Sequence, residues 1–269
     1  MTTSAGDDSR TLLINGTVAA ALAVISMILV HELAHVVAGL AMGVGGTLYS
    51  YGVAPAGNPA DPAGGIIAIA APIFSLVSGL VMTQWQPLRR RAGFGHLVWL
   101  LFAFTSMMEG IGYLVIAPFG AGDTAAAVGY FGWPDWVPWV MFVVGVLLQF
   151  TLAWMYAPHV GQIAGPDRGR LLAFALWAWL IATGLIVLLQ IITVSWARMD
   201  LTDGEATAII AASTALLVFS PMALIFGRRV NAAPYKPLGL PPVPVPGILA
   251  LAAMIIAQQV LNLGVPVGV

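Results

Sequence analysis

Apolar runs about 20 residues long recur along the whole chain, and they constrain its fold more than any other feature of the sequence. A helix of about 20 residues is what the roughly 30 Å hydrocarbon core of a bilayer requires. We place seven such runs, with six as the alternative count, at residues 13–42, 65–84, 96–117, 137–157, 171–196, 206–227 and 247–263. The sequence therefore predicts an all-α fold, a polytopic bundle of about seven transmembrane helices that forms one membrane domain.

The composition agrees with a membrane protein and excludes several other classes. Hydrophobic residues make up 60% of the 269 residues and charged residues only 8%, against about 25% charged residues in an ordinary soluble domain. The formal net charge of -1 provides no basic field for a phosphate backbone, so we expect no nucleic-acid partner. Because cysteine is absent, any metal ion must be held by histidine and carboxylate side chains.

The basic residues predict the orientation of the chain in the membrane. In a seven-span arrangement only Arg198 lies on one side, and the other nine lie on the opposite side: Arg10, Arg89, Arg90, Arg91, Arg168, Arg170, Arg228, Arg229 and Lys236. Lys and Arg concentrate in cytoplasmic loops. We therefore expect a cytoplasmic N-terminus and an external C-terminus.

The loop between the first two runs, residues 45–65, is rich in Gly, Pro and Ala. Within it, residues 47–53 alternate in polarity, which is typical of a strand with one buried face. We expect either a short β-hairpin or an extended loop after the first helix, with residues 47–53 as an edge strand.

The motif that carries chemistry lies in the first apolar run, where His31, Glu32 and His35 form the pattern H-E-x-x-H. On a helix, positions i and i+4 differ by about 40° of rotation and about 6 Å of rise, so both imidazoles point to one side. Glu32 borders the same side, which is the arrangement of a zinc site with its general base. The alternative is that the histidines bond to neighbouring helices and that Glu32 is protonated.

A catalytic zinc site needs a third protein ligand, and two carboxylates compete for this role. The first and third runs are parallel, so a ligand at the C-terminal end of the third run meets the motif at a similar depth. Asp123 fits this requirement, whereas Glu109 lies 14 residues earlier, about 21 Å lower along a continuous helix. We favour Asp123, with Glu109 as the alternative ligand. Without a metal, Asp123 would cap a helix and Glu109 would be a proton-carrying or helix-pairing carboxyl.

With these residues in view, the chain resembles the site-2 protease family of intramembrane zinc metallopeptidases, especially small bacterial members without accessory domains. The resemblance rests on H-E-L-A-H at residues 31–35, on the small-residue segment AAPIFSLVSG at residues 70–79, and on Pro118 and Asp123. The family's third ligand is the Asp of N-x-x-P-x-x-x-x-D-G. Here the spacing from Pro to Asp matches, while Val115 replaces the Asn and Thr124 replaces the final Gly.

This resemblance implies that residues 13–140 form a metallopeptidase-like core, while the apolar runs within residues 141–269 predict additional transmembrane helices that the resemblance does not explain. It implies that Zn²⁺ is held by His31, His35 and Asp123, and that Glu32 activates the zinc-bound water. The substrate would be a membrane protein or peptide, cleaved in a segment within or beside the bilayer of a bacterial-type cytoplasmic membrane. Residues 47–53 would pair with the unwound substrate.

Two other functions remain open at this point. One is a non-catalytic metal-binding scaffold or regulatory subunit derived from such a protease, and the other is a proton-coupled transporter that uses Glu32 and Glu109. Since no dedicated recognition domain is predicted, specificity would come from the loops, the helices, a partner subunit or a second copy of the chain.

Overall fold

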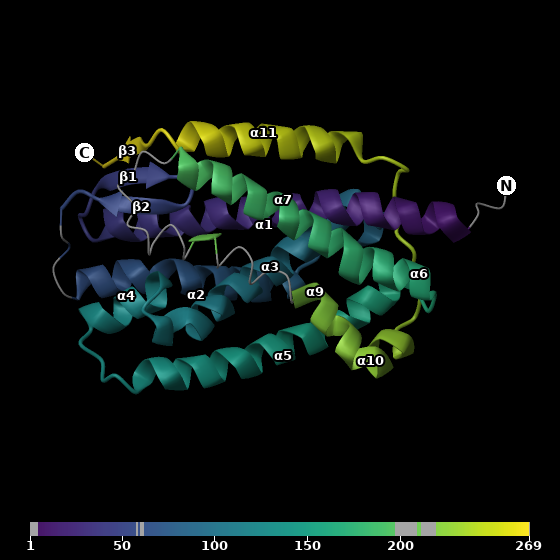
Figure 1. Cartoon of the computed structure of the whole chain (residues 1–269), viewed down its shortest axis with the longest axis horizontal. Helices are drawn as coiled ribbons and strands as arrows, with labels where there is room; N and C mark the ends of the chain where they lie inside the picture. Colours follow the sequence, from purple (N-terminus) through teal and green to yellow (C-terminus); the bar gives the residue numbers. More distant parts are fainter. Residues whose placement is uncertain (1–4, 58, 60–61, 197–208, 211–218, 269) are drawn as a thin grey trace.

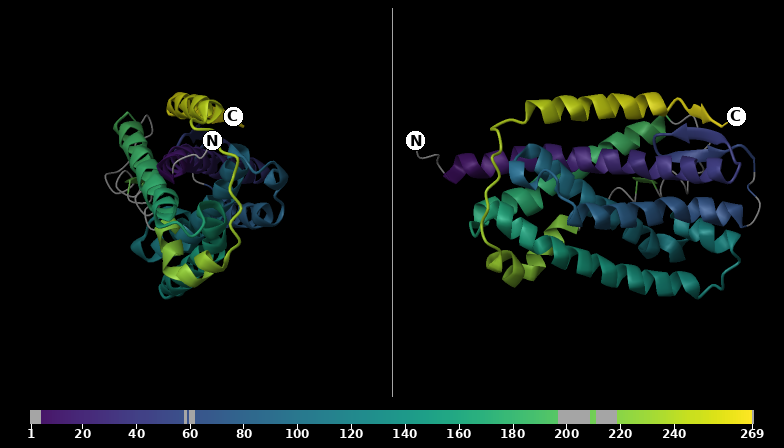
Figure 2. Two further views of the ribbon diagram at one scale, coloured as in Figure 1. Left: turned by 90° about the vertical axis from the view of Figure 1, so that its right-hand side faces the viewer. Right: turned by 180° about the vertical axis from the view of Figure 1, so that it is seen from behind.

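The computed structural model describes residues 5–57, 59, 62–196, 209–210 and 219–268, and within these ranges the chain is a bundle of helices with one small sheet. Figure 1 shows the helices lying roughly along the long axis of the molecule, with the N-terminus and the C-terminus at opposite ends. Figure 2 shows the same bundle from its end and from behind. The predicted all-α membrane bundle is therefore confirmed as a class.

Among the described residues, five helical stretches are long and apolar enough to cross a membrane: Asp8–Ala41, Ala63–Gln84, Phe94–Phe119, Val137–Ala164 and Arg168–Ser195. They correspond to the first five predicted runs. The last predicted run is α11 (Val245–Leu261), a helix of 17 residues. Half of the run predicted at 206–227 falls outside the described residues, so the count of seven stays a prediction.

These stretches and the short helices between them comprise the following elements: α1 (Ala5–Ala41), α2 (Ala63–Gln84), η1 (Arg89–Arg91), α3 (Phe94–Ile116), η2 (Ala117–Phe119), α4 (Gly122–Tyr130), α5 (Val137–Ala164), α6 (Arg168–Leu171), η3 (Leu172–Trp177) and α7 (Ala178–Ser195). After residue 218 the chain continues with α9 (Phe219–Met222), η5 (Ala223–Phe226) and α10 (Gly227–Ala232), and then with α11. Of the first five stretches, the α1 and α3 stretches have the most buried apolar windows, 61% in each, against 28% for α5. The helix that carries the H-E-x-x-H motif is therefore central in the bundle.

Helices α2 and α3 approach each other closely because glycines face the contact. A Cβ on Gly79 would lie 2.5 Å from the carbonyl oxygen of Ala103, and a Cβ on Gly110 would lie 2.5 Å from that of Pro72. Side chains at these positions would push the helices apart. The close fit fixes α2, which contributes two groups to the site described below.

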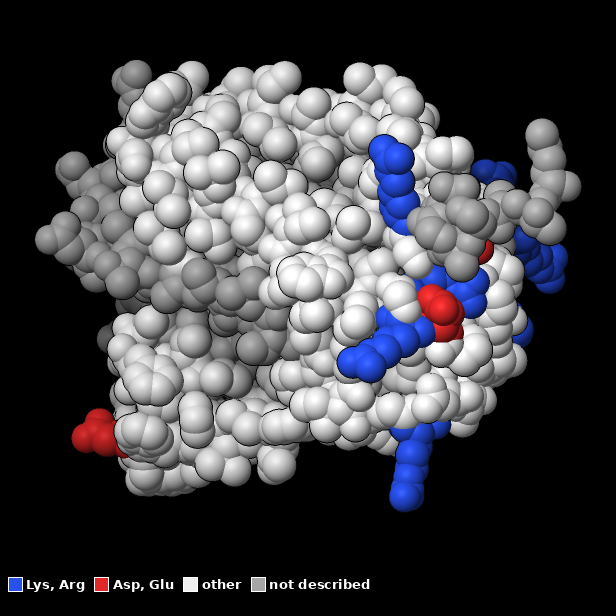
Figure 3. Space-filling view, turned by 45° about the vertical axis from the view of Figure 1, so that its right-hand side comes forward, with Lys and Arg blue, Asp and Glu red and all other residues white. Residues whose placement is uncertain are grey.

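The outer helices expose apolar side chains instead of polar ones. On α5 these include Val140, Val143, Val144, Leu147 and Phe150. An apolar outer surface of this kind suits contact with lipid. Figure 3 shows the Lys and Arg side chains of that view gathered at the end of the bundle where the N-terminus lies.

The loop after α1 forms a hairpin, as one of the two predicted alternatives had it. Strand β1 (Gly46–Tyr49) pairs antiparallel with β2 (Gly52–Pro55) across a turn at Ser50 and Tyr51. The prediction of a single edge strand at 47–53 is wrong, because this turn divides the segment. Strand β3 (Val265–Val267) pairs with the other side of β1, so the order is β2-β1-β3 and β2 is an edge.

Candidate metal centre

The site begins with the way α1 divides its C-terminal half into two faces. His31, Glu32 and His35 are buried, and His31 is only 1% exposed. Val37, on the same stretch of helix, is 66% exposed. Since residues i and i+4 lie on one side of a helix, both imidazoles face the interior of the bundle. The local periodicity alone brings these two side chains together.

Asp123 reaches the histidines because the helical course of the chain is interrupted after α3. The helix gives way to η2, which contains Pro118, and Gly120 then adopts a left-handed φ of 69°. The next helix, α4, starts at Gly122, so Asp123 lies in its first turn, and the N-cap residue is Ala121. The carboxylate is therefore free to point toward α1 instead of capping its own helix.

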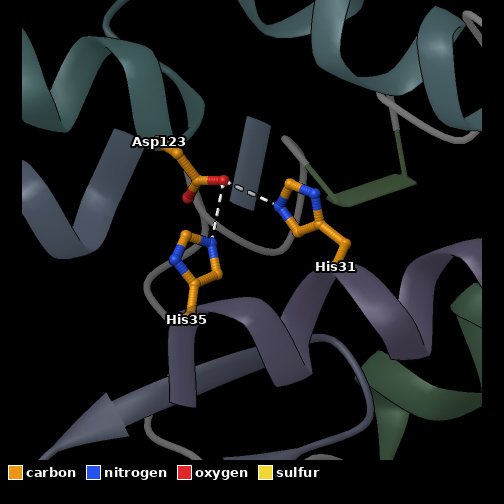
Figure 4. Close-up of side chains that lie close together, drawn as sticks. All are labelled: His31, His35 and Asp123. Carbon is orange, nitrogen blue, oxygen red and sulfur yellow. Dashed lines mark hydrogen bonds and ion pairs between the residues drawn. The ribbon is translucent and has the colours of Figure 1, made fainter. Parts of the chain in front are cut away.

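One carboxylate oxygen lies between the two imidazoles, as Figure 4 shows. The Oδ2 atom of Asp123 is 2.9 Å from Nε2 of His31 and 3.1 Å from Nε2 of His35. The two rings are edge to face, with centroids 5.0 Å apart and planes at 81°. Two nitrogens and one oxygen, from α1 and α4, thus converge on one point.

The other nitrogens of the two rings are held by α2. Nδ1 of His35 lies 2.8 Å from the carbonyl oxygen of Ile67, and Nδ1 of His31 lies 3.1 Å from the hydroxyl of Ser75. A carbonyl oxygen only accepts, so Nδ1 of His35 donates to it. In a neutral His35 ring, Nε2 then carries a lone pair directed at the Asp123 carboxylate. Two acceptors in this position require a cation between them, either a proton or a metal ion.

Asp123 is ionised, so its carboxylate can stabilise a positive charge at the point where the three side chains converge. Burial disfavours the charged carboxylate, but the hydrogen bonds to His31 and His35 outweigh it and hold the pKa of Asp123 below its usual range. The carboxylate is thus ionised at neutral pH and supplies a formal negative charge to the group.

The three side chains could hold a metal ion. One ligand atom from each of His31, His35 and Asp123 lies within 4.8 Å of the others. Metal bonds of about 2.0–2.1 Å in a tetrahedral site place ligand atoms about 3.3 Å apart, close to the nitrogen-to-oxygen distances found here. Glu109 is not a member of this group, although it lies close enough to His31 to interact with it electrostatically.

A cavity of about 750 Å³ opens beside the three ligands. Glu32, His35 and Asp123 line one part of its wall, and Gly52 and Val53 of the edge strand β2 line another. Most other lining residues are small or apolar, so the ionisable groups stand out in an otherwise uncharged wall. The cavity connects the candidate metal centre with β2, an edge strand of the sheet among the described residues.

Sequence reasoning did not identify three of the groups that shape this site: the Ser75 hydroxyl, the Ile67 carbonyl and the side chain of Tyr113. Ser75 could have been found from the sequence, because it is a polar residue inside the apolar run 65–84. A backbone carbonyl is present at every residue, so the sequence cannot single one out. Tyr113 packs on His31 with ring centroids 5.0 Å apart, a contact that only the packed helices reveal.

Neither the family models nor the curated proteins nor the solved structures compared with this chain include a match.

Proposed function

We propose that the chain is an intramembrane zinc metallopeptidase that hydrolyses a peptide bond in a membrane-embedded or membrane-adjacent segment of its substrate. The observation that carries this proposal is the convergence of His31, His35 and Asp123 on one point beside a cavity that Glu32 also lines. The alternative ligand Glu109 is less favoured, because it does not share that point.

Zinc fits this donor set better than other common metals. Two imidazole nitrogens and one carboxylate oxygen, with a further position open, match the ligand number of catalytic zinc sites. Calcium and magnesium prefer six or more oxygen ligands, which the three side chains do not provide. The hydrogen bonds between Nδ1 of each imidazole and α2 orient the rings as second-layer partners of a metal site do.

Glu32 is the residue to which we assign the proton transfers. A zinc ion bound here would activate a water molecule as a nucleophile and polarise the substrate carbonyl. Glu32 lines the same cavity as His35 and Asp123, so its carboxylate has access to that water. It takes a proton from the water and later delivers a proton to the leaving amine.

The edge strand β2 provides a way to hold the substrate. Its outer side is unpaired within the sheet order β2-β1-β3, and Gly52 and Val53 line the cavity. An extended peptide that pairs with β2 would run past the ligand group. This assignment favours a substrate segment that is unwound at the cleavage position, because a helix has no free backbone groups for strand pairing.

Metal analysis and cleavage assays together test the proposal. We would purify the wild type, His31→Ala, Asp123→Ala and Glu32→Gln in detergent, and assay them in liposomes that contain a library of single-span substrates. We expect one zinc per chain in the wild type and in Glu32→Gln, and none in the other two. Cleavage should occur with the wild type alone.

Two outcomes would replace the proposal with another function. A wild type that binds zinc but cleaves no membrane segment would be a metal-binding scaffold or regulatory subunit. A zinc-free wild type whose Glu32 and Glu109 are needed for pH-driven transport would be a transporter.

We also propose that the N-terminal end is cytoplasmic and the C-terminal end external, since nine of the ten basic residues fall on the N-terminal side of a seven-span chain. The absence of cysteine makes labelling straightforward, because an introduced thiol is unique. A membrane-impermeant thiol reagent added outside intact cells should label Asp135→Cys and leave Arg90→Cys unlabelled. The reverse pattern would contradict this orientation.

A further inference from the structure

The aromatic ring of Tyr113, on α3, lies against a candidate metal ligand. Its ring and that of His31 are stacked, with centroids 5.0 Å apart and planes 8° from parallel. A ring stacked in this way restricts rotation of the imidazole about its own side-chain bonds. The other constraint on that imidazole is the hydrogen bond between its Nδ1 and Ser75. Together they hold His31 from α3 and from α2.

Tyr113 also acts on the second ligand-bearing segment. Its side chain lies close enough to the Asp123 carboxylate to interact with it electrostatically. The residue before Asp123 is Gly122, which has a left-handed φ of 76°, and a Cβ there would lie 2.7 Å from the Tyr113 ring. The backbone that leads into Asp123 is therefore shaped around this ring, and only glycine fits there.

We propose that Tyr113 is a positioning residue that holds His31 with its ring and Asp123 with its hydroxyl, so that the ligand atoms of the two side chains meet at one point. The inference rests on the metal site of the proposed function and is independent of peptidase activity.

The two contacts can be separated by substitution. Tyr113→Phe keeps the stacked ring and removes the hydroxyl, while Tyr113→Leu removes both. Loss of a second-layer partner reduces metal affinity by about 10- to 100-fold. We expect Tyr113→Phe to weaken zinc binding by about tenfold and Tyr113→Leu by up to about 100-fold. Tyr130 lines the same cavity and belongs to none of these contacts, so Tyr130→Phe is the matched control.

The experiment measures the zinc Kd of detergent-purified protein by competition with a chromophoric chelator. Visible absorption of the cobalt-substituted protein reports the ligand geometry directly. In Tyr113→Phe we expect a weaker Kd and a changed cobalt spectrum while the thermal unfolding midpoint of the metal-free protein stays that of the wild type. A general loss of structure would instead lower that midpoint.

A wild-type Kd in both Tyr113 variants would overturn the proposal. A wild-type Kd in Tyr113→Phe together with lost substrate cleavage would also overturn it, in favour of a direct contact between the hydroxyl and the substrate. Absence of zinc from the wild type would overturn the metal centre itself, and with it both this inference and the proposed function. Zinc binding that depends on Tyr113 in a protein that cleaves nothing would support this inference and contradict the peptidase.

Discussion

The two halves of α1 differ in what holds them in place. In the N-terminal half, buried side chains such as Ala19, Ala20 and Ala23 pack against neighbouring helices, and the buried polar residue Asn15 donates a hydrogen bond to the carbonyl of Pro241. In the C-terminal half, three ionisable side chains within five consecutive positions are buried: His31, Glu32 and His35. The N-terminal half thus belongs to the apolar core of the bundle, whereas the C-terminal half carries two of the candidate metal ligands.

This difference separates the part of α1 that packs in the apolar core from the part that carries buried ionisable side chains. An ionisable side chain at the centre of a membrane helix costs about 2.5–3.5 kcal/mol on insertion scales. The C-terminal half therefore needs partners from elsewhere, and it receives them from Ser75 and Ile67 on α2 and from Asp123 on α4. Substitutions in the two halves should consequently have different effects, one on folding and the other on metal binding or catalysis.

The largest expected effect is that of Glu32→Gln on catalysis. A positioned general acid or base contributes about 10²- to 10⁴-fold to a rate, so we expect a loss of cleavage of that size. Zinc content and the thermal unfolding midpoint should match the wild type, because Glu32 is outside the ligand group. The measurement is the initial rate of substrate cleavage in liposomes. Retained activity would remove Glu32 from the mechanism and leave the polar half of α1 without its assigned base.

Overpacking the other half should give the next largest effect, and on stability alone. Ala23 is fully buried in the apolar core, so Ala23→Leu forces neighbouring side chains to move and costs about 1–3 kcal/mol. We expect a lower thermal unfolding midpoint in detergent and an unchanged zinc Kd in the protein that remains folded. A weaker zinc Kd at constant stability would show that the two halves of α1 are not independent.

A smaller effect should follow from removing one support of the site. Ser75→Ala takes away the hydroxyl that contacts Nδ1 of His31, and we expect zinc affinity to fall by about tenfold. The hydroxyl of the neighbouring Ser78 donates a hydrogen bond to the Ser75 carbonyl of its own helix, which makes Ser78→Ala a control with an unchanged Kd. Equal zinc affinities in the two variants would mean that the contact between Ser75 and His31 does not orient the ring.

The smallest effect is expected on the outer face of the polar half. Val37 is exposed two positions after His35, and substitutions away from packed features change stability by about 0.5 kcal/mol or less. Val37→Leu should therefore leave the unfolding midpoint, the zinc Kd and the cleavage rate as in the wild type. A marked loss of cleavage alone would identify this face of α1 as a substrate contact.

The sequence predicted those parts of the molecule that depend on local periodicity. The first five apolar runs match described helices, and the spacing of His31 and His35 was sufficient to put both rings on one face. The proximity of Asp123 followed from comparing depths along two parallel helices, since α3 continues unbroken past Glu109 to Ile116.

The remaining features depend on contacts between distant segments. Strand β3 is three residues long and contains Pro266, which suits an edge strand but gives no strand signal by itself. The roles of Ile67 and Tyr113 come from a backbone carbonyl and from ring stacking, and neither has a sequence pattern. The turn that divides residues 47–53 was missed for a related reason, because alternation in polarity does not reveal where a hairpin reverses.

The pairing of β1 with β3 has a consequence for how the protein is made. Leu48 pairs with Val265, more than 200 residues later in the chain, and Val267 lines the cavity. This ladder can close only after residues 265–267 have been synthesised, and contacts between such distant segments form slowly. The wall of the cavity is thus completed only after the chain has been synthesised as far as β3.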